Sequence, residues 1–305
     1  GGTSLLLLLP ELRRLSIDID IIVPKSVTIA EINEILKNIV RTSSFTRYEE
    51  QERHLSQIPK AHFKLFYESP FDQSEVYVLL DVLFEENPYS RLDSTDIVCP
   101  FIDTIPPNVT VKVPSIADIL GDKLTAFAPN TTGILYDKEK EMEIIKQLFD
   151  IESLFDQLST TNGVKDTFIR CAEQELNYRQ LTEMNYENVL DDIFKTAIII
   201  GGRGSFDKET FLKLENGIRR IKSHIINRNY IVEEAVVSAS KAAYLSMLLK
   251  YRQEDIEKYH PKETLPELEG VPLFKKMAKI KNFSPEAYYY FAKAQELIRR
   301  SEKTK

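Results

Sequence analysis

The spacing of apolar residues changes along the chain, and this change predicts two structural parts. In the first part, alternating polar and apolar residues predict a strand over 16–23. Strands are also predicted over 60–67 and 75–84, which are rich in Val, Phe, Tyr and Leu, and over 109–113, which prolines bracket. The polar residues 68–74 predict a hairpin between the second and third of these strands. Helical spacing predicts helices over 4–9, 29–40 and 116–127, and Ser115 is expected to cap the last of them.

From about residue 138 onward the apolar spacing is helical throughout. Helices are expected over 138–157, 164–176, 186–199, 208–224, 231–251 and 285–301, with loops at 160–163, 201–205 and 261–270. The pattern therefore predicts an α+β protein. A mixed β-sheet domain is expected over 1–157, followed by an α-helical domain over 158–305.

Composition narrows the class of protein. The 305 residues are 43% hydrophobic with a mean hydropathy of −0.26, which argues against a membrane protein. The apolar run Leu5–Leu9 is too short to cross a bilayer and lacks the basic flank of a secretion signal. The formal charge of −7 disfavours coating of nucleic acid by bulk electrostatics but leaves room for a local basic patch.

Cys99 and Cys171 stand far apart without a CxxC motif, so the sequence predicts neither a disulfide framework nor a zinc site. This usage is typical of a reducing compartment, and a cytoplasmic location is expected. The four histidines form no HExxH motif or His/Cys cluster, which argues against a zinc hydrolase. Because the sequence starts with Gly1-Gly2 rather than Met, we expect it to begin inside a longer gene product or after a tag remnant.

Two aspartates alternate on the first predicted strand. Residues two apart on a strand share a face, so Asp18 and Asp20 are expected to point the same way while Ile17, Ile19 and Ile21 bury the other face. Two adjacent carboxylates repel each other, and a divalent cation between them relieves that cost. The pair therefore suggests a Mg²⁺ site, with a solvated strand face as the alternative.

Upstream, Gly1-Gly2-Thr3-Ser4 precedes the first apolar helix. Glycines let the backbone approach an anion closely, hydroxyls donate to phosphate oxygens, and a helix start adds its N–H groups. A phosphate-binding turn and an ordinary helix cap are both compatible with this segment.

In combination, the glycine-hydroxyl turn, the short helix and the DxD strand resemble the nucleotidyltransferase fold shared with polymerase beta. GGTS followed by Arg14-x-Ser16-x-Asp18-x-Asp20 more narrowly resembles the AbiEii/AbiGii toxin family of toxin–antitoxin and phage-abortive systems. The likeness covers about residues 1–156. It continues with a lysine in segment 122–127 (DKLTAF) and an aspartate in segment 146–151 (KQLFDI), where Gln147 replaces the first of two acids usual in such families.

The resemblance implies a role for each matching residue. Asp18 and Asp20 would bind Mg²⁺ or Mn²⁺, with Asp81 on a neighbouring strand as candidate third carboxylate, either a metal ligand or the base that deprotonates the attacking hydroxyl. Lys123 would neutralise triphosphate charge, and Asp150 would orient Lys123 or the acceptor. The alternatives are a capped strand-edge charge for Asp81, a solvated helix lysine for Lys123 and an exposed helix carboxylate for Asp150. The implied phosphate-binding residues are Gly1, Gly2, Thr3, Ser4, Arg14, Ser16 and Lys123.

The implied reaction moves a nucleoside monophosphate from an NTP to an acceptor hydroxyl. The expected acceptor is RNA, with tRNA as the first candidate. The chain is expected to be a toxin that has a cognate antitoxin and a role in phage defence. No membrane partner is expected. A protein hydroxyl acceptor and a catalytically silent scaffold remain alternatives.

The C-terminal stretch 261–305 carries ten Lys/Arg against six Glu and, together with Arg219, Arg220, Lys222 and Arg228, would suit an RNA backbone. Residues 288–291 (YYYF) would then stack on bases. The alternative is that the charged helices are solvated and the aromatic residues form core. Segment 201–205 (GGRGS) lacks the GK[ST] ending of a phosphate loop, so an interhelical loop is expected there.

Overall fold

The computed structural model describes residues 1–304 except 12, 17, 52–57, 102, 227, 263 and 267–274; the side chains of Asp137 and Thr304 are also outside the description. The chain forms two compact units. Unit 1 comprises residues 1–88 and 94–113, and unit 2 comprises residues 89–93 and 114–305. The domain boundary expected at residue 157 stays a prediction.

Unit 1 is built on a mixed four-stranded sheet with strand order β1-β4-β3-β2. Strands β3 (Lys60–Glu68) and β4 (Glu75–Phe84) form the predicted hairpin. Strand β1 (Ile19–Val23) lies parallel to β4, and β2 (Arg47–Glu50) lies antiparallel to β3. The α+β class expected from the apolar pattern is confirmed.

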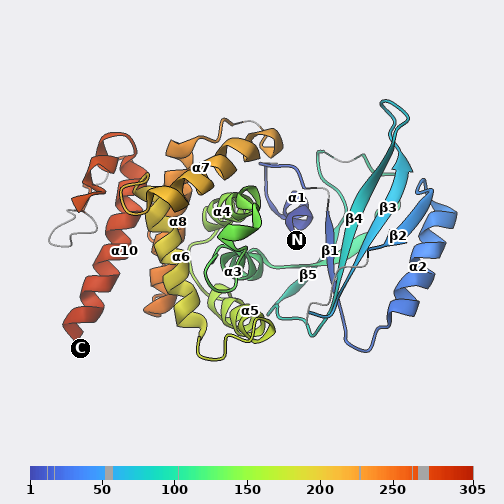
Figure 1. Cartoon of the computed structure of the whole chain (residues 1–305), viewed down its shortest axis with the longest axis horizontal. Helices are drawn as coiled ribbons and strands as arrows, with labels where there is room; N and C mark the ends of the chain where they lie inside the picture. The colour runs from blue at the N-terminus through green and yellow to red at the C-terminus, as the bar shows by residue number, and fades with distance from the viewer. Residues whose placement is uncertain are drawn as a thin grey trace. The chain divides into compact units, whose positions relative to one another are not determined.

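Helix α2 (Ile29–Thr42) packs on one face of this sheet (Figure 1). Its buried residues Ile32 and Leu36 form a core with Phe63 on β3 and Val82 on β4. Thr28 and Glu31 form a capping box that satisfies N–H groups at the start of the helix. Because alternate strand residues point to opposite faces, the neighbours of Phe63 and Val82 along their strands point away from α2.

The edge position of β1 overturns one expectation. Ile19 and Ile21 were expected to be buried, but they are 43% and 36% exposed. They pair with Leu80 and Val82 at the outer side of the sheet, whereas the core under α2 centres on β3 and β4. Ile17, the third isoleucine of that prediction, lies outside the described residues.

The remaining elements of unit 1 are short. A 3-10 turn, η1 (Gly2–Ser4), runs into α1 (Leu5–Leu8), as the sequence predicts. Strand β6 (Thr110–Pro114) is confirmed and pairs with β5 (Leu92–Asp96) in a two-stranded sheet. The sequence pattern misses β2 and β5 because RYEE and LDSTD lack apolar alternation, so pairing with a neighbour is what makes them strands.

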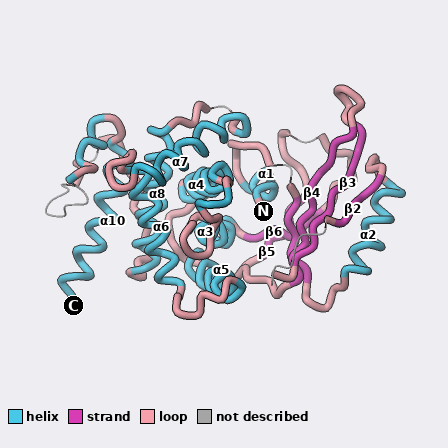
Figure 2. Tube along the Cα trace, in the orientation of Figure 1, coloured by secondary structure: helices cyan, strands magenta, loops and turns pink. Residues whose placement is uncertain are grey.

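Unit 2 is helical, as expected (Figure 2). Its helices are α3 (Ile116–Ala126), α4 (Glu141–Phe155), α5 (Val164–Tyr178), α6 (Tyr186–Gly201), α7 (Lys208–Ile221), α8 (Val232–Lys250) and α10 (Pro285–Thr304), with 3-10 turns η2 (Tyr136–Lys138), η3 (Lys222–His224) and η4 (Ala278–Asn282). Ser115 caps α3 as predicted by accepting from the Asp118 N–H. Helix α8 packs against α4, α6 and α10 and is buried along most of its length.

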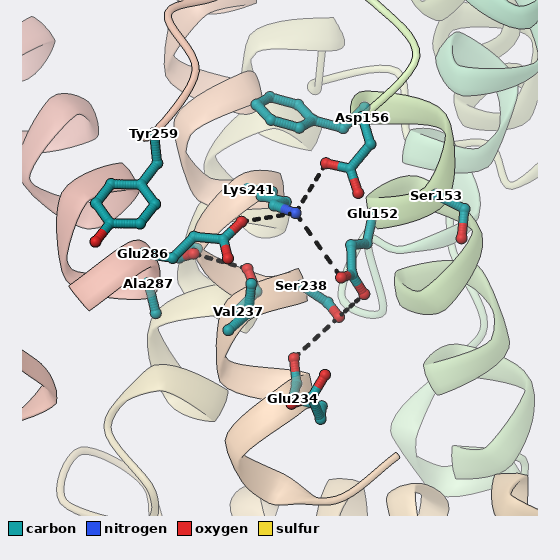
Figure 3. A network of polar contacts seen from close by, with 12 residues as sticks. Glu152, Ser153, Asp156, Glu234, Val237, Ser238, Lys241, Tyr259, Glu286 and Ala287 are labelled. Carbon is teal, nitrogen blue, oxygen red and sulfur yellow. Dashed lines mark hydrogen bonds and ion pairs between the residues drawn. The ribbon is translucent and has the colours of Figure 1, made fainter. Parts of the chain in front are cut away.

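A buried ion network ties α4, α8 and α10 together (Figure 3). Lys241 Nζ lies 2.8 Å from Asp156 Oδ1, 2.9 Å from Glu286 Oε1 and 3.8 Å from Glu152 Oε1. Ser238 donates to Glu152 at 2.7 Å. Burial opposes the charge of Lys241, but the carboxylates outweigh it and hold the pKa of this lysine above its usual value. The network therefore keeps a full positive charge inside the helical unit.

Two negative expectations can be compared with the structure. Both cysteines are free, in line with the prediction of no disulfide. No helix in the described part of the chain is long and apolar enough to cross a membrane.

Candidate active site

The glycine-hydroxyl turn at the start of unit 1 folds back onto the DxD segment. Thr3 Oγ1 donates to the backbone carbonyl of Asp18 and lies 3.4 Å from Ser16 Oγ. The Gly1 nitrogen lies 3.9 Å from Asp20 Oδ2. The two sequence motifs, separated along the chain, are therefore one structural feature.

Both glycines permit this close approach. A Cβ on Gly1 would overlap the carboxylate of Asp20. A Cβ on Gly2 would lie 2.6 Å from Arg14 Nη2 and 2.7 Å from Ser16 Oγ. A larger residue at either position would displace these side chains from the turn. Of the phosphate-binding residues that the resemblance implies, Arg14 and Ser16 thus lie against the Gly1–Gly2 turn, whereas Lys123 belongs to unit 2.

Asp20 and Asp81 lie side by side on the sheet. They are in-register partners of the parallel pair β1–β4, so both side chains point to the same face, the one opposite α2. Asp18 lies just before β1, and its backbone carbonyl is held by Thr3. The capped strand-edge alternative for Asp81 fails because β4 lies between β1 and β3.

These carboxylates suit a divalent cation by their chemistry. Oxygen donors of this kind are the preferred ligands of Mg²⁺. Among the residues that the structure describes, no group of three or more acidic, His or Cys side chains lies close enough to hold a metal ion. The fit therefore rests on the type of donor and on the shared face of Asp20 and Asp81.

His62 is a site residue that the sequence analysis misses. It lies on β3 directly opposite Asp81, and its Nδ1 is 2.7 Å from Asp81 Oδ1. The hairpin register contains the signal, because His62 and Asp81 are each six residues from the closing pair Glu68 and Glu75. Counting histidine motifs along the sequence does not reveal a pair made across a sheet.

In unit 2, Lys123 and Asp150 form a buried ion pair. Lys123 lies in the last turn of α3 and Asp150 in α4, and Nζ to Oδ2 is 3.3 Å. Their side chains are 10% and 2% exposed. The alternatives of a solvated lysine and an exposed carboxylate are therefore wrong, and Asp150 does contact Lys123.

Gln147 lies one helical turn before Asp150 on α4. Its Oε1 is buried and has no hydrogen-bond partner among the described residues. A buried acceptor without a donor costs roughly 1–3 kcal/mol. Gln147 thus carries an unsatisfied acceptor on the same helix as Asp150.

The basic and aromatic residues proposed for RNA behave differently from one another. The four residues 288–291 are all at most 5% exposed, so the stacking hypothesis is wrong and they are core. Arg228 pairs with Glu152, and Arg219 with Glu215. Exposed lysines remain along the segment around η4: Lys275, Lys276, Lys279 and Lys281. Segment 201–205 joins α6 to α7, as expected for an interhelical loop.

Unit 1 thus combines a mixed sheet that carries Asp20 and Asp81 on one face with a glycine-hydroxyl turn that contacts the DxD segment, and the comparison with protein families shows the class, a nucleotidyl transferase. The family model described as nucleotidyl transferase AbiEii toxin, type IV toxin–antitoxin system, matches residues 1–255. The chain belongs to this AbiEii family, and is a nucleotidyl transferase toxin of that type.

The match extends beyond the motifs. The sequence motifs cover residues up to about 156, whereas the family model continues to residue 255 and includes helices α5 to α8. Most of the helical unit is therefore part of the family rather than particular to this chain. Helix α10 lies outside the matched residues.

Among solved structures, the crystal structure of JHP933 from Helicobacter pylori is similar to this chain at 14% identity and a TM-score of 0.41, over 82% of each chain. Comparison with curated proteins gives no match.

Proposed function

We propose that this toxin transfers a nucleoside monophosphate from an NTP to a hydroxyl of RNA, with tRNA as the first candidate. The acceptor oxygen attacks the α-phosphorus, the bond from that phosphorus to the bridging oxygen breaks, and pyrophosphate leaves. The proton of the attacking hydroxyl passes to a carboxylate, for which Asp81 is the candidate.

The observation that carries the proposal is the packing of Gly1-Gly2 against Asp20, Arg14 and Ser16, with Asp81 beside Asp20. This arrangement puts backbone, a cation and hydroxyls next to carboxylates, which is the combination that a nucleoside triphosphate and its cation need.

Mg²⁺ or Mn²⁺ is the proposed cofactor, held by Asp18, Asp20 and Asp81. When bound, it would stabilise the negative charge that develops on the attacking and leaving oxygens. The role of the protein is to hold the carboxylates on one face of the sheet and to present the Gly1–Ser4 turn to the phosphates of the NTP.

Lys123 is proposed to neutralise charge on the triphosphate. Lysine acts on phosphate as a point charge, and Asp150 fixes the position of its ammonium group. Lys123 and the carboxylates of the sheet belong to different compact units, and the proposal that they act together rests on the family pattern.

Support for RNA as acceptor comes from the exposed lysines at 275–281, because phosphate backbones bind to lysine clusters. A protein hydroxyl is the second candidate acceptor. The family implies a cognate antitoxin. Activity in the cytoplasm and a role in phage defence complete the proposal.

The deciding experiment is transfer of label from each of the four α-³²P NTPs, with Mg²⁺, onto total cellular RNA and protein. Wild type is compared with Asp20→Ala and with Asp103→Ala, an exposed aspartate of the same unit that serves as a matched control. We expect one RNA band to be labelled by wild type and by Asp103→Ala but not by Asp20→Ala.

Label on protein alone would replace RNA by the second acceptor. Absence of label from any NTP on either pool, with the protein folded, would favour the silent scaffold.

A further inference from the structure

We propose that His62 is a positioning residue that holds Asp81 in its active orientation, an inference that rests on the proposed function. The ring binds one carboxylate oxygen, Oδ1, and leaves Oδ2 for a cation or for the proton of the attacking hydroxyl.

The sheet fixes this contact from both sides. In the antiparallel pair β3–β4, His62 is the in-register partner of Asp81, and in the parallel pair β1–β4 the partner of Asp81 is Asp20. In-register partners share a face, so the three side chains form a row across β3, β4 and β1. The row lies on the face opposite α2, because Phe63 and Val82, the next residues on their strands, are fully buried against that helix.

Burial distinguishes the two ends of the contact. The His62 side chain is 13% exposed, whereas that of Asp81 is 37% exposed. The ring is thus confined, and the carboxylate that it binds remains accessible. This arrangement is expected when His62, the confined donor, orients the Asp81 carboxylate and the accessible carboxylate takes part in the reaction.

The physical effect is on rotation of the carboxylate. Without a donor at Oδ1, the carboxylate can turn about its χ2 bond, a broad torsion with no sharp minima. A hydrogen bond of 2.7 Å at one oxygen selects a narrow range of that torsion. Such supporting contacts typically change metal affinity or activity by about 10- to 100-fold when they are removed.

The test uses three substitutions of His62 that differ in where they place a donor. In His62→Asn the amide nitrogen occupies the position of Nδ1, in His62→Gln it is one bond further out, and His62→Leu has no donor. His260→Leu, at an exposed histidine of unit 2, is the matched control. Affinity for Mn²⁺ alone is measured by calorimetric titration, kcat and KM are measured with NTP and RNA, and thermal unfolding reports on the fold.

We expect His62→Leu and His62→Gln to lose about 10-fold or more in both Mn²⁺ affinity and kcat, with KM for NTP little changed. His62→Asn and His260→Leu should stay within a few-fold of wild type. In an Asp81→Asn background, His62→Leu should lower neither Mn²⁺ affinity nor kcat any further, because His62 acts through the carboxylate of Asp81.

Wild-type Mn²⁺ affinity and kcat in His62→Leu would overturn the inference, as would equal losses in the Asn and Leu variants. If wild type transfers no label but binds Mn²⁺, the proposed function fails, and the Mn²⁺ affinities of the variants still decide the role of His62. A wild type that binds no Mn²⁺ would overturn both.

Discussion

At the scale of single residues, the site depends on two glycines, which have no side chains. Gly1 and Gly2 contribute no side-chain atoms, and this lets Asp20, Arg14 and Ser16 lie against the turn. A methyl group at either position would have to displace the side chains that lie against the turn.

Gly1→Ala and Gly2→Ala should impair transfer in different ways. The new methyl at Gly1 displaces the Asp20 carboxylate, so we expect kcat to fall by about 10- to 100-fold. The methyl at Gly2 displaces Arg14 and Ser16, so we expect mainly a higher KM for NTP. Steady-state kinetics check both, and unchanged unfolding temperatures should accompany them because the displaced atoms are ends of side chains. Wild-type kinetics in both variants would contradict the phosphate-binding role of the turn.

Gln147 allows a prediction about stability. Gln147→Met keeps the size of the side chain and removes the buried Oε1 that has no partner among the described residues. We expect the free energy of unfolding to rise by about 1 kcal/mol, measured by urea denaturation. A decrease of that size would mean that the amide is satisfied in the folded protein.

At the scale of elements, the contact between α3 and α4 includes one buried ion pair, Lys123–Asp150. Taking both charges out of water is costly, and each depends on the other for compensation. The pair therefore serves the packing of two helices as well as the proposed chemistry, so substitutions at either residue should lower stability as well as activity.

Lys123→Met should destabilise the protein by about 3–5 kcal/mol, because it leaves Asp150 buried without its cation partner at Nζ. The matched control is Lys37→Met, which breaks the exposed pair with Glu34 and should change the free energy of unfolding very little, because water screens exposed ion pairs. Urea denaturation measures both. Equal effects of the two substitutions would show that the Lys123–Asp150 pair is solvated in solution.

The end of α4 provides a prediction about pH. Lys258 donates to the Phe155 carbonyl, and burial, with Lys241 nearby, lowers the pKa of Lys258 to about 8. Between that value and the ordinary 10.5, the unfolded chain holds a proton that the folded protein has released, so stability should rise with pH across this window. The rise should be lost in Lys258→Met. Urea denaturation of both proteins across the window tests this, and parallel curves would contradict it.

At the scale of the whole molecule, the chain has two compact units with separate cores. Leu36 is buried beneath the sheet of unit 1, whereas Leu124 and Phe149 are buried among the helices of unit 2. Each core excludes water independently, so each unit has its own source of stability.

Calorimetry should accordingly resolve two unfolding transitions. Leu36→Ala should destabilise unit 1 and Leu124→Ala unit 2, each by about 2–5 kcal/mol in unfolding free energy. Each substitution should therefore lower the temperature of one transition only. A single transition lowered equally by both substitutions would show that the units unfold as one.

Much of this molecule is determined locally, and the sequence alone predicts that part. Apolar spacing is set by the 2-residue and 3.6-residue periods of strands and helices, so the hairpin, α2, α3 and the helices of unit 2 are predicted within a few residues. Asp18 and Asp20 stand out because two carboxylates two residues apart share a strand face, whereas Gly1 to Ser4, Lys123 and Asp150 are singled out through the resemblance to a family pattern.

The tertiary structure decides which residues are in contact and which are exposed. The pairing of His62 with Asp81 depends on strand register, and the exposure of Ile19 depends on β1 being an edge strand. The burial of Lys123 beside Asp150 and of the aromatic run 288–291 depends on which helix faces are covered. None of these is a local property, because each follows from contacts between segments far apart in the chain, whose energies no single stretch of sequence contains.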